Sequence, residues 1–387
     1  MRILTFSNTP LDPMLGSGKV RIRLRDGLRA RGHEVTVLDS DGFSIRWKKV
    51  LGRNLNMAVG ATQMLQRLPW RSFDLIEFCG GEFWRATEWL SRQPGLRPMI
   101  VARTDGLELL ASERLSQSSA TGDAASPLRR LLRKIPMFDY ATRARGAFRH
   151  ADRFASLCRL DQEWVIRHGY FRPGHTAVAP PGLDDAFLNA PGAAQKDRQL
   201  AFFGSWVARK GIVTLAEVSS RILKSDPDCE LVLMGCGETP SATILGAFPE
   251  TVRSRIRIIP RSPTGTIATL LARARVFFFP TEYEGFGMAT AEAMACGCAV
   301  VTTPTGFGGE LVDGTEAMIC PFGDADAMEA AIRRLLADTP FSRRLESAGR
   351  QRVRMLRWET QVSTLETHYG KWLHEWAEAD KRHAAGP

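Results

Sequence analysis

Short apolar runs alternate with amphipathic segments along nearly the whole chain. The runs show little polar alternation, which predicts strands of a parallel sheet that is buried on both faces. The expected strands before residue 189 are Arg2–Ser7, Glu34–Asp39, Phe73–Phe78, Met99–Arg103, Arg153–Leu157 and Thr176–Ala179. Those after it are Gln199–Phe203, Glu230–Met234, Arg257–Ile259, Val276–Phe279, Ala299–Thr302 and Ala317–Cys320. This order predicts two doubly wound, Rossmann-like α/β domains.

The boundary between these domains is expected in residues 189–198, which are mostly small or polar. Residues 1–188 would form the N-terminal domain and residues 199–357 the C-terminal one. The tail, residues 358–387, has the apolar spacing of a helix and either completes the second domain or crosses back onto the first. Doubly wound sheets bind ligands beyond the carboxyl ends of their strands, so two facing domains would form a binding cleft.

The composition is that of an ordinary globular protein, with 387 residues, 44% apolar and 24% charged. The net charge of +10 favours anionic partners such as phosphorylated ligands, nucleic acid or an acidic membrane. Seven cysteines without a CxxC pair disfavour a zinc site or a disulfide framework and favour a reducing compartment. No apolar run approaches the roughly 18 residues that span a bilayer, and the first residues lack the apolar stretch of a signal peptide. We therefore expect a cytoplasmic protein.

Two basic segments of the first domain interleave cations with apolar residues, as interfacial helices do. Residues 126–153 carry eight Arg or Lys residues against two Asp residues. The smaller segment has Arg46, Lys48, Lys49 and Arg53 beside Trp47. A solvated helix face explains each segment alone, and together they suggest peripheral contact with the anionic inner face of a membrane.

A glycine-rich loop follows the first expected strand and contains Gly16 and Gly18. It matches neither phosphate-loop pattern, because Val20 follows Lys19 and Arg21 stands where a third glycine would be needed. The loop is either a plain tight turn or a place where backbone amides approach a ligand. Hydrolase elbows and metal-binding spacings are absent from the sequence, so no metal site is predicted.

The most informative stretch is 276–297, where a buried strand ends at Pro280 and an Ala-rich helix opens near Met288. Glu284 stands in the loop between them, and Glu292 lies in the first turns of the helix. Amides at a helix start suit a phosphate, and carboxylates accept hydrogen bonds from sugar hydroxyls. The alternatives are a helix-start charge at Glu284 and a surface carboxylate at Glu292. A glycosidase pair is disfavoured, because neither position is visibly tuned as an acid.

Two cations, Arg209 and Lys210, follow the first strand of the second domain. Cations at that sheet edge can neutralise a diphosphate leaving group in the way that a metal would. The cations of an Arg-Lys-Gly sequence alone are usually solvated. The downstream glutamates support a binding role for Arg209 and Lys210.

The arrangement resembles the retaining glycosyltransferases of the GT-B fold, family 4, and the resemblance is strongest from residue 199 to about residue 335. It rests on Gly204 to Gly211, Leu231 to Gly237, the Glu284 and Glu292 pair around Gly-Phe-Gly, Ala295 to Thr303, and Gly308 to Val312. Gly32 to Val37 and Val178 to Asp184 resemble the family's N-terminal and inter-domain landmarks.

The resemblance implies a nucleotide-sugar donor on the second domain and no obligatory metal or other cofactor. Glu292 would hold the ribose, Glu284 the hydroxyls of the transferred sugar and Lys210 the diphosphate, with Glu284 and Lys210 as the catalytic residues. The remaining donor-binding candidates are Arg209, Gly235, Gly285, Phe286, Gly287, Gly16 and Gly18. Attack from the front face would retain the anomeric configuration, with the leaving phosphate helping to deprotonate the acceptor.

Two positions depart from the family pattern. Ser205 replaces an arginine that commonly contacts the diphosphate, so either Arg209 substitutes for it or phosphate binding is weaker. The loop after the fourth strand offers Asp105 where the family often has histidine, and we take Arg103 and Asp105 as acceptor-side candidates.

The sequence therefore predicts a retaining hexosyltransferase that acts on a glycan or a lipid-linked glycan, because the basic segments lie in the first domain. The alternatives are a nucleotide-sugar epimerase on the same fold and a non-catalytic nucleotide-sugar-binding protein. Nucleic-acid binding is supported only by bulk charge, without a recognition motif, so no nucleic-acid partner is expected.

Overall fold

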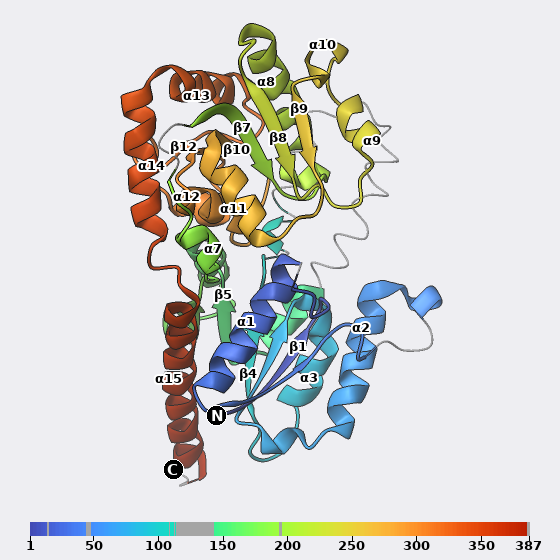
Figure 1. The fold of residues 1–387 in the computed structure, drawn as a ribbon. Helices are drawn as coiled ribbons and strands as arrows, with labels where there is room; N and C mark the ends of the chain where they lie inside the picture. Colours follow the sequence, from blue (N-terminus) through green and yellow to red (C-terminus); the bar gives the residue numbers. More distant parts are fainter. Residues whose placement is uncertain are drawn as a thin grey trace. The chain divides into compact units, whose positions relative to one another are not determined.

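The computed structural model describes residues 1–13, 15–43, 48–107, 109–111, 113, 143–192 and 196–384. The chain divides into two compact units. Unit 1 comprises Met1–Gly182 and Trp358–Pro387, and unit 2 comprises Leu183–Arg357. Each unit contains one parallel sheet with helices packed against it (Figure 1).

Unit 1 is built on a six-stranded sheet in the order β2-β1-β3-β4-β5-β6. Its strands are β1 (Arg2–Ser7), β2 (Glu34–Leu38), β3 (Leu75–Cys79), β4 (Met99–Arg103), β5 (Arg153–Ser156) and β6 (Thr176–Val178). Its helices include α1 (Gly16–Ala30), α2 (Lys48–Arg67), α3 (Trp84–Ser91), α6 (Arg159–Arg167) and α15 (Trp358–Ala384). Every residue of β3 and β4 is buried, whereas the edge strand β2 is largely accessible.

Unit 2 has a second six-stranded sheet in the order β12-β11-β10-β7-β8-β9. Its strands are β7 (Asp197–Phe203), β8 (Glu230–Met234), β9 (Ile256–Ile259), β10 (Ala274–Phe279), β11 (Ala299–Thr302) and β12 (Met318–Ile319). Its helices are α7 (Asp185–Leu188), α8 (Ile212–Ser225), α9 (Ser241–Gly246), α10 (Glu250–Arg253), α11 (Thr264–Arg273), α12 (Met288–Ala295), α13 (Ala325–Ala337) and α14 (Thr339–Val353), among the residues that the structure describes.

The predicted fold class, two doubly wound α/β domains, is confirmed by these two sheets. Each predicted strand is found, and the bounds differ by at most two residues. Strands β7 and β10 begin two residues earlier than predicted, because they continue through the polar residues Asp197 and Arg275 and backbone pairing does not require an apolar side chain. A cleft between the two domains stays a prediction.

The division between the units falls at Gly182 and Leu183, earlier in the chain than the segment 189–198 in which the sequence placed it. The amide of Leu183 donates to the carbonyl of Leu356 at 2.7 Å, so the two connections between the units run side by side. The short helix α7 then packs against α11 and α12, and its Phe187 is buried in unit 2. A helix of one turn leaves too little periodicity in the sequence to be recognised.

Helix α15 packs against α1 in unit 1, which shows which of the two alternatives for the tail is realised (Figure 1). Gly27 of α1 leaves room for Val362, since a Cβ atom at Gly27 would stand 2.6 Å from a Val362 methyl group. The buried Tyr369 donates its hydroxyl hydrogen bond to Glu77 Oε1 at 2.8 Å. The helix is thus anchored to the sheet of unit 1 by both packing and a buried hydrogen bond.

The two basic segments lie mostly outside the described residues, which omit 44–47 and 114–142 and the side chains of 48–54. Arg153, at the end of the larger segment, is buried in β5 and pairs with Glu375 at 3.2 Å. It therefore contributes no charge to a surface patch. Within the described part of the chain, no helix has the length and apolarity needed to cross a bilayer.

Candidate functional site

The strand order of unit 2 places a topological switch point between β7 and β10. The chain leaves β7 toward β8 on one side and later returns to β10 on the other side. Ligands of doubly wound sheets bind at such points, beyond the carboxyl ends of the strands. The turn after β7, Ala208–Lys210, and the loop between β10 and α12 therefore supply the candidate site.

Glu284 is the centre of a compact polar cluster at this point. Its Oε1 atom accepts hydrogen bonds from Lys210 Nζ at 2.6 Å, Thr281 Oγ1 at 2.8 Å and Arg209 Nη1 at 3.3 Å. Arg209 also donates to the carbonyl of Tyr283 at 2.6 Å. The structure thus brings together three residues that the sequence singled out, although 74 positions separate Lys210 from Glu284.

The electrostatics of the cluster favour an anionic ligand. The side chains of Lys210 and Glu284 are 14% and 10% exposed, whereas that of Arg209 is 41% exposed. Burial lowers the pKa of the Lys210 ammonium, and Glu284 opposes this shift by stabilising the charged form. Two cations share one carboxylate oxygen, so a phosphate that approaches them meets donors already held in place.

Gly211 brings the turn that carries Lys210 close to the end of β10. Its φ angle is +69°, and a Cβ atom at this position would stand 1.8 Å from the carbonyl oxygen of Pro280. No side chain other than hydrogen fits such a contact. The close approach of these two backbones sets the distance between Lys210 and Glu284.

Replacing Gly211 with alanine is expected to destabilise unit 2 by about 3 kcal/mol, because strain at positive φ adds to a backbone clash. Urea unfolding measures the effect. Gly265→Ala in α11 is the matched control, since no atom lies within 4 Å of its Cβ position. A Gly211→Ala protein as stable as this control would show that the close approach is not needed.

The start of α12 is fixed by a second loop. Gly287, with φ +91°, immediately precedes α12, and the buried Phe286 stacks on Phe307 with ring centroids 5.1 Å apart. The amide of Glu284 donates to Thr305 Oγ1 at 2.8 Å. The amides at the start of a helix carry partial positive charge, so the start of α12 suits an anionic ligand.

Glu292 and Gly235 lie on elements beside this cluster. Glu292 is buried in α12, in the second turn of the helix. Gly235 follows β8 with φ +68°, and a Cβ atom there would approach the Phe203 ring to 2.9 Å. The predicted contact of Glu292 with a ribose and that of Gly235 with the donor stay predictions.

The remaining candidates belong to unit 1. Gly16 and Gly18 lie in the first turn of α1 and not in the loop that the sequence predicted. A Cβ atom at Gly18 would stand 2.4 Å from the carbonyl oxygen of Asp12, so the packing of the preceding loop against α1 requires this glycine, whereas no atom lies within 4 Å of that position at Gly16. Arg103 is fully buried in β4 and donates to Glu77 at 3.3 Å, which keeps it inside the protein. Asp105 keeps 24% of its side chain exposed. Of the two acceptor-side candidates, only Asp105 reaches the surface.

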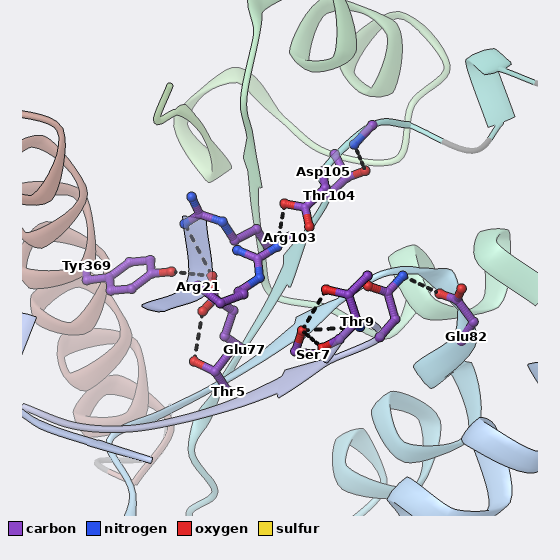
Figure 2. Close-up of polar contacts among 12 residues, drawn as sticks. Thr5, Ser7, Thr9, Arg21, Glu77, Glu82, Arg103, Thr104, Asp105 and Tyr369 are labelled. Atoms are coloured by element: carbon purple, nitrogen blue, oxygen red, sulfur yellow. Dashed lines mark hydrogen bonds and ion pairs between the residues drawn. The ribbon is translucent and has the colours of Figure 1, made fainter. Parts of the chain in front are cut away.

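The sequence analysis does not identify several polar residues near the carboxyl ends of the strands in the two units. Thr281 Oγ1 donates to Glu284 Oε1, and Thr305 Oγ1 accepts from the amide of Glu284. Asn8 Nδ2 donates to Glu82 Oε2 at 3.1 Å, and Figure 2 labels Glu82 at this contact. Asn8 and Glu82 follow the paired strands β1 and β3, which flank the switch point of unit 1. The signal available in the sequence is a polar residue within three positions of the end of a buried strand.

Residues 184–352 match the family described as "Glycosyl transferases group 1", a range that lies within unit 2. The chain is 32% identical over 208 residues to alpha-maltose-1-phosphate synthase of Mycolicibacterium smegmatis, which covers 50% of this chain and 52% of the relative. It is 26% identical over 243 residues to D-inositol 3-phosphate glycosyltransferase of Corynebacterium diphtheriae, with 57% of each chain covered. The chain thus spans about half the length of the curated relatives it matches.

Solved structures share the fold over almost the whole chain. Sucrose-phosphate synthase from Thermosynechococcus elongatus aligns with a TM-score of 0.72 at 19% identity, covering 97% of this chain and 100% of that one. WaaG, a glycosyltransferase involved in lipopolysaccharide biosynthesis, aligns with a TM-score of 0.69 at 16% identity, covering 94% and 98%. Identities this low show the fold alone. The protein has the two-domain GT-B fold, and its second unit carries the glycosyltransferase family match.

Proposed function

We propose that this protein is a retaining glycosyltransferase that moves a hexose from a nucleoside-diphosphate sugar to an acceptor hydroxyl. The observation that carries the proposal is the cluster of Lys210, Arg209 and Glu284 at the switch point of unit 2. The family match over residues 184–352 supports it, because the matched range contains the whole cluster.

The proposed chemistry assigns a separate task to each group. Lys210 and Arg209 neutralise the diphosphate, while Glu284 holds both cations through Oε1 and presents Oε2 to a sugar hydroxyl. The bond between the anomeric carbon and the phosphate oxygen breaks, and its electron pair stays on the phosphate. The acceptor oxygen bonds to the same face of that carbon, and its proton passes to the leaving phosphate. The anomeric configuration is thereby retained.

The remaining features of the proposal concern partners and place in the cell. We propose that no metal is obligatory, because the two cations supply the positive charge that the leaving group needs. The acceptor is a glycan or a lipid-linked glycan. Peripheral contact with an anionic membrane rests on residues 126–153 and on the smaller basic segment, of which the greater part lies outside the described residues.

A thermal-shift screen against UDP, GDP and ADP tests the donor site in buffer that contains EDTA. One nucleotide is expected to stabilise the protein by about 2.7 kcal/mol at a hundredfold excess over its Kd. Its sugar conjugates are then incubated with acceptors, and proton NMR reports the anomeric configuration of the product. An epimerase would change the donor sugar without an acceptor, and a non-catalytic binder would be stabilised without turnover. Stabilisation by none of the three nucleotides would contradict the proposed donor site.

A further inference from the structure

A buried ion pair joins α1 to the loop after β4 in unit 1. Arg21 is only 2% exposed, and its Nη2 atom donates to Asp105 Oδ1 at 2.5 Å (Figure 2). The Nε and Nη1 atoms of Arg21 are also buried, and neither has a hydrogen-bond partner among the described residues. Burying a guanidinium whose N–H groups lack hydrogen-bond partners costs folding free energy. Apolar side chains of similar volume can often replace a buried ion pair without loss of stability. Arg21 stabilises unit 1 through its charge, which helps to hold the pKa of Glu77 down, but its direct hydrogen bond goes to Asp105.

The neighbouring carboxylate, Glu77, is already committed to other partners. It accepts hydrogen bonds from Arg103 at 3.3 Å, Tyr369 at 2.8 Å and Thr5 at 2.9 Å (Figure 2). Glu77 is thus the hydrogen-bonded counterion of Arg103, and Asp105 is that of Arg21. Among the residues that the structure describes, Asp105 is the ion-pair partner of Arg21, and this contact orients the Asp105 carboxylate.

Asp105 is held rigidly at the carboxyl edge of the sheet. Thr104 Oγ1 accepts a hydrogen bond from the amide of Gly106 at 3.0 Å, and the amide of Leu107 donates to Asp161 Oδ2 at 3.1 Å. In the described part of the chain, the hydrogen bond of the Asp105 carboxylate is made by Oδ1, and the side chain keeps 24% of its surface exposed. An ionised carboxylate only accepts hydrogen bonds. A carboxylate that is held in place and partly exposed therefore binds a hydroxyl or amide donor and repels an anion.

We propose that Asp105 binds a neutral hydroxyl of the acceptor and that Arg21 is its positioning residue. The inference rests on the proposed function and deepens it, because it names the chemistry that unit 1 recognises. A sugar or polyol that places an uncharged hydroxyl beside Asp105 fits this edge of the sheet. A phosphate or carboxylate at the same place is repelled by the negative charge of Asp105. Asp105 then sets which acceptor is used, while Lys210 and Glu284 bind the donor.

The test uses the full chain with the donor found above and two acceptor pairs, maltose with maltose 1-phosphate and myo-inositol with myo-inositol 3-phosphate. We expect wild-type transfer to a neutral member to exceed transfer to its phosphate ester about tenfold or more in kcat/KM. Asp105→Asn should lose about 10- to 100-fold on the neutral acceptor, while nucleotide affinity and donor hydrolysis change by less than about twofold.

Arg21→Lys tests positioning, because it keeps the charge but loses the planar fork of donors. Its KM for the neutral acceptor should rise about tenfold without a change in donor hydrolysis. Asp152→Asn is the matched control: Asp152 pairs with Arg97 at 2.7 Å, is 14% exposed and lies at the opposite, amino edge of the sheet. This variant should lower Tm while leaving the acceptor KM unchanged.

Three results would overturn the inference: preference for the phosphate esters in the wild type, unchanged transfer in Asp105→Asn, or an equal rise in acceptor KM in the Asp152→Asn control. Donor hydrolysis without transfer to either neutral acceptor would also overturn it. If the wild-type protein neither binds a nucleoside diphosphate nor turns over its sugar conjugate, the proposed function itself is contradicted. The two failures are therefore distinguishable.

Discussion

Lys210→Met is expected to lower kcat/KM for sugar transfer about 1000-fold. The substitution removes the buried ammonium that we assign to the departing diphosphate, and losses of this size follow when a single preorganised charge partner of a transition state is removed. Methionine suits the site, because it has similar length and the Lys210 side chain is only 14% exposed. Steady-state rates at saturating acceptor measure the effect.

Two companion variants separate this loss from a general effect of charge. Arg209→Met should cost only about tenfold, since the more exposed Arg209 is better screened by water. Lys224→Met, on the exposed side of α8, should leave the rate unchanged. A Lys210→Met enzyme within about threefold of the wild type would remove Lys210 from the mechanism.

Removal of Glu77 is expected to produce the largest loss of stability. Glu77→Leu leaves Arg103 buried without its direct counterion and takes the partner from Tyr369 and Thr5. Breaking a buried ion pair on one side costs about 3 to 5 kcal/mol. Urea unfolding followed by tryptophan fluorescence measures the change. Glu34→Gln, which breaks the exposed pair with Arg2, is the control and should cost less than about 1 kcal/mol.

Glu77 also makes the stability of unit 1 depend on pH. Burial alone would raise the pKa of Glu77, but the positive charges of Arg103 and Arg21 outweigh it and hold this pKa below the usual value. A carboxyl group with a depressed pKa stabilises the fold above its unfolded pKa of about 4.3, and this stability is lost as the pH falls toward the folded pKa. Glu77→Leu should therefore flatten the acid limb of the stability curve. An unchanged acid limb would contradict the assignment.

The sequence was sufficient to predict the two sheets and the cluster of Lys210 and Glu284. Buried parallel strands are nearly pure apolar runs, which makes them visible without a structure. Lys210 and Glu284 each follow such a strand, and the rule that carboxyl ends of parallel strands share one edge brings them together across 74 positions.

The buried network of unit 1 could not be predicted in the same way. It joins Glu77 to Tyr369, 292 positions away, and no local pattern encodes such a contact. The one available signal was Glu77 itself, a charged residue inside the apolar run Leu75–Cys79. A charge at that position requires a partner, but strand order and the packing of α15 determine which partner it finds.

The central claim is that Lys210 binds the diphosphate of the donor. Calorimetric titration of the wild type and Lys210→Met with the preferred nucleoside diphosphate and its monophosphate tests it directly. The variant should lose about tenfold or more in affinity for the diphosphate and less than about twofold for the monophosphate, whose single phosphate lies closer to the ribose. Equal losses for both nucleotides, or no loss for either, would contradict the claim.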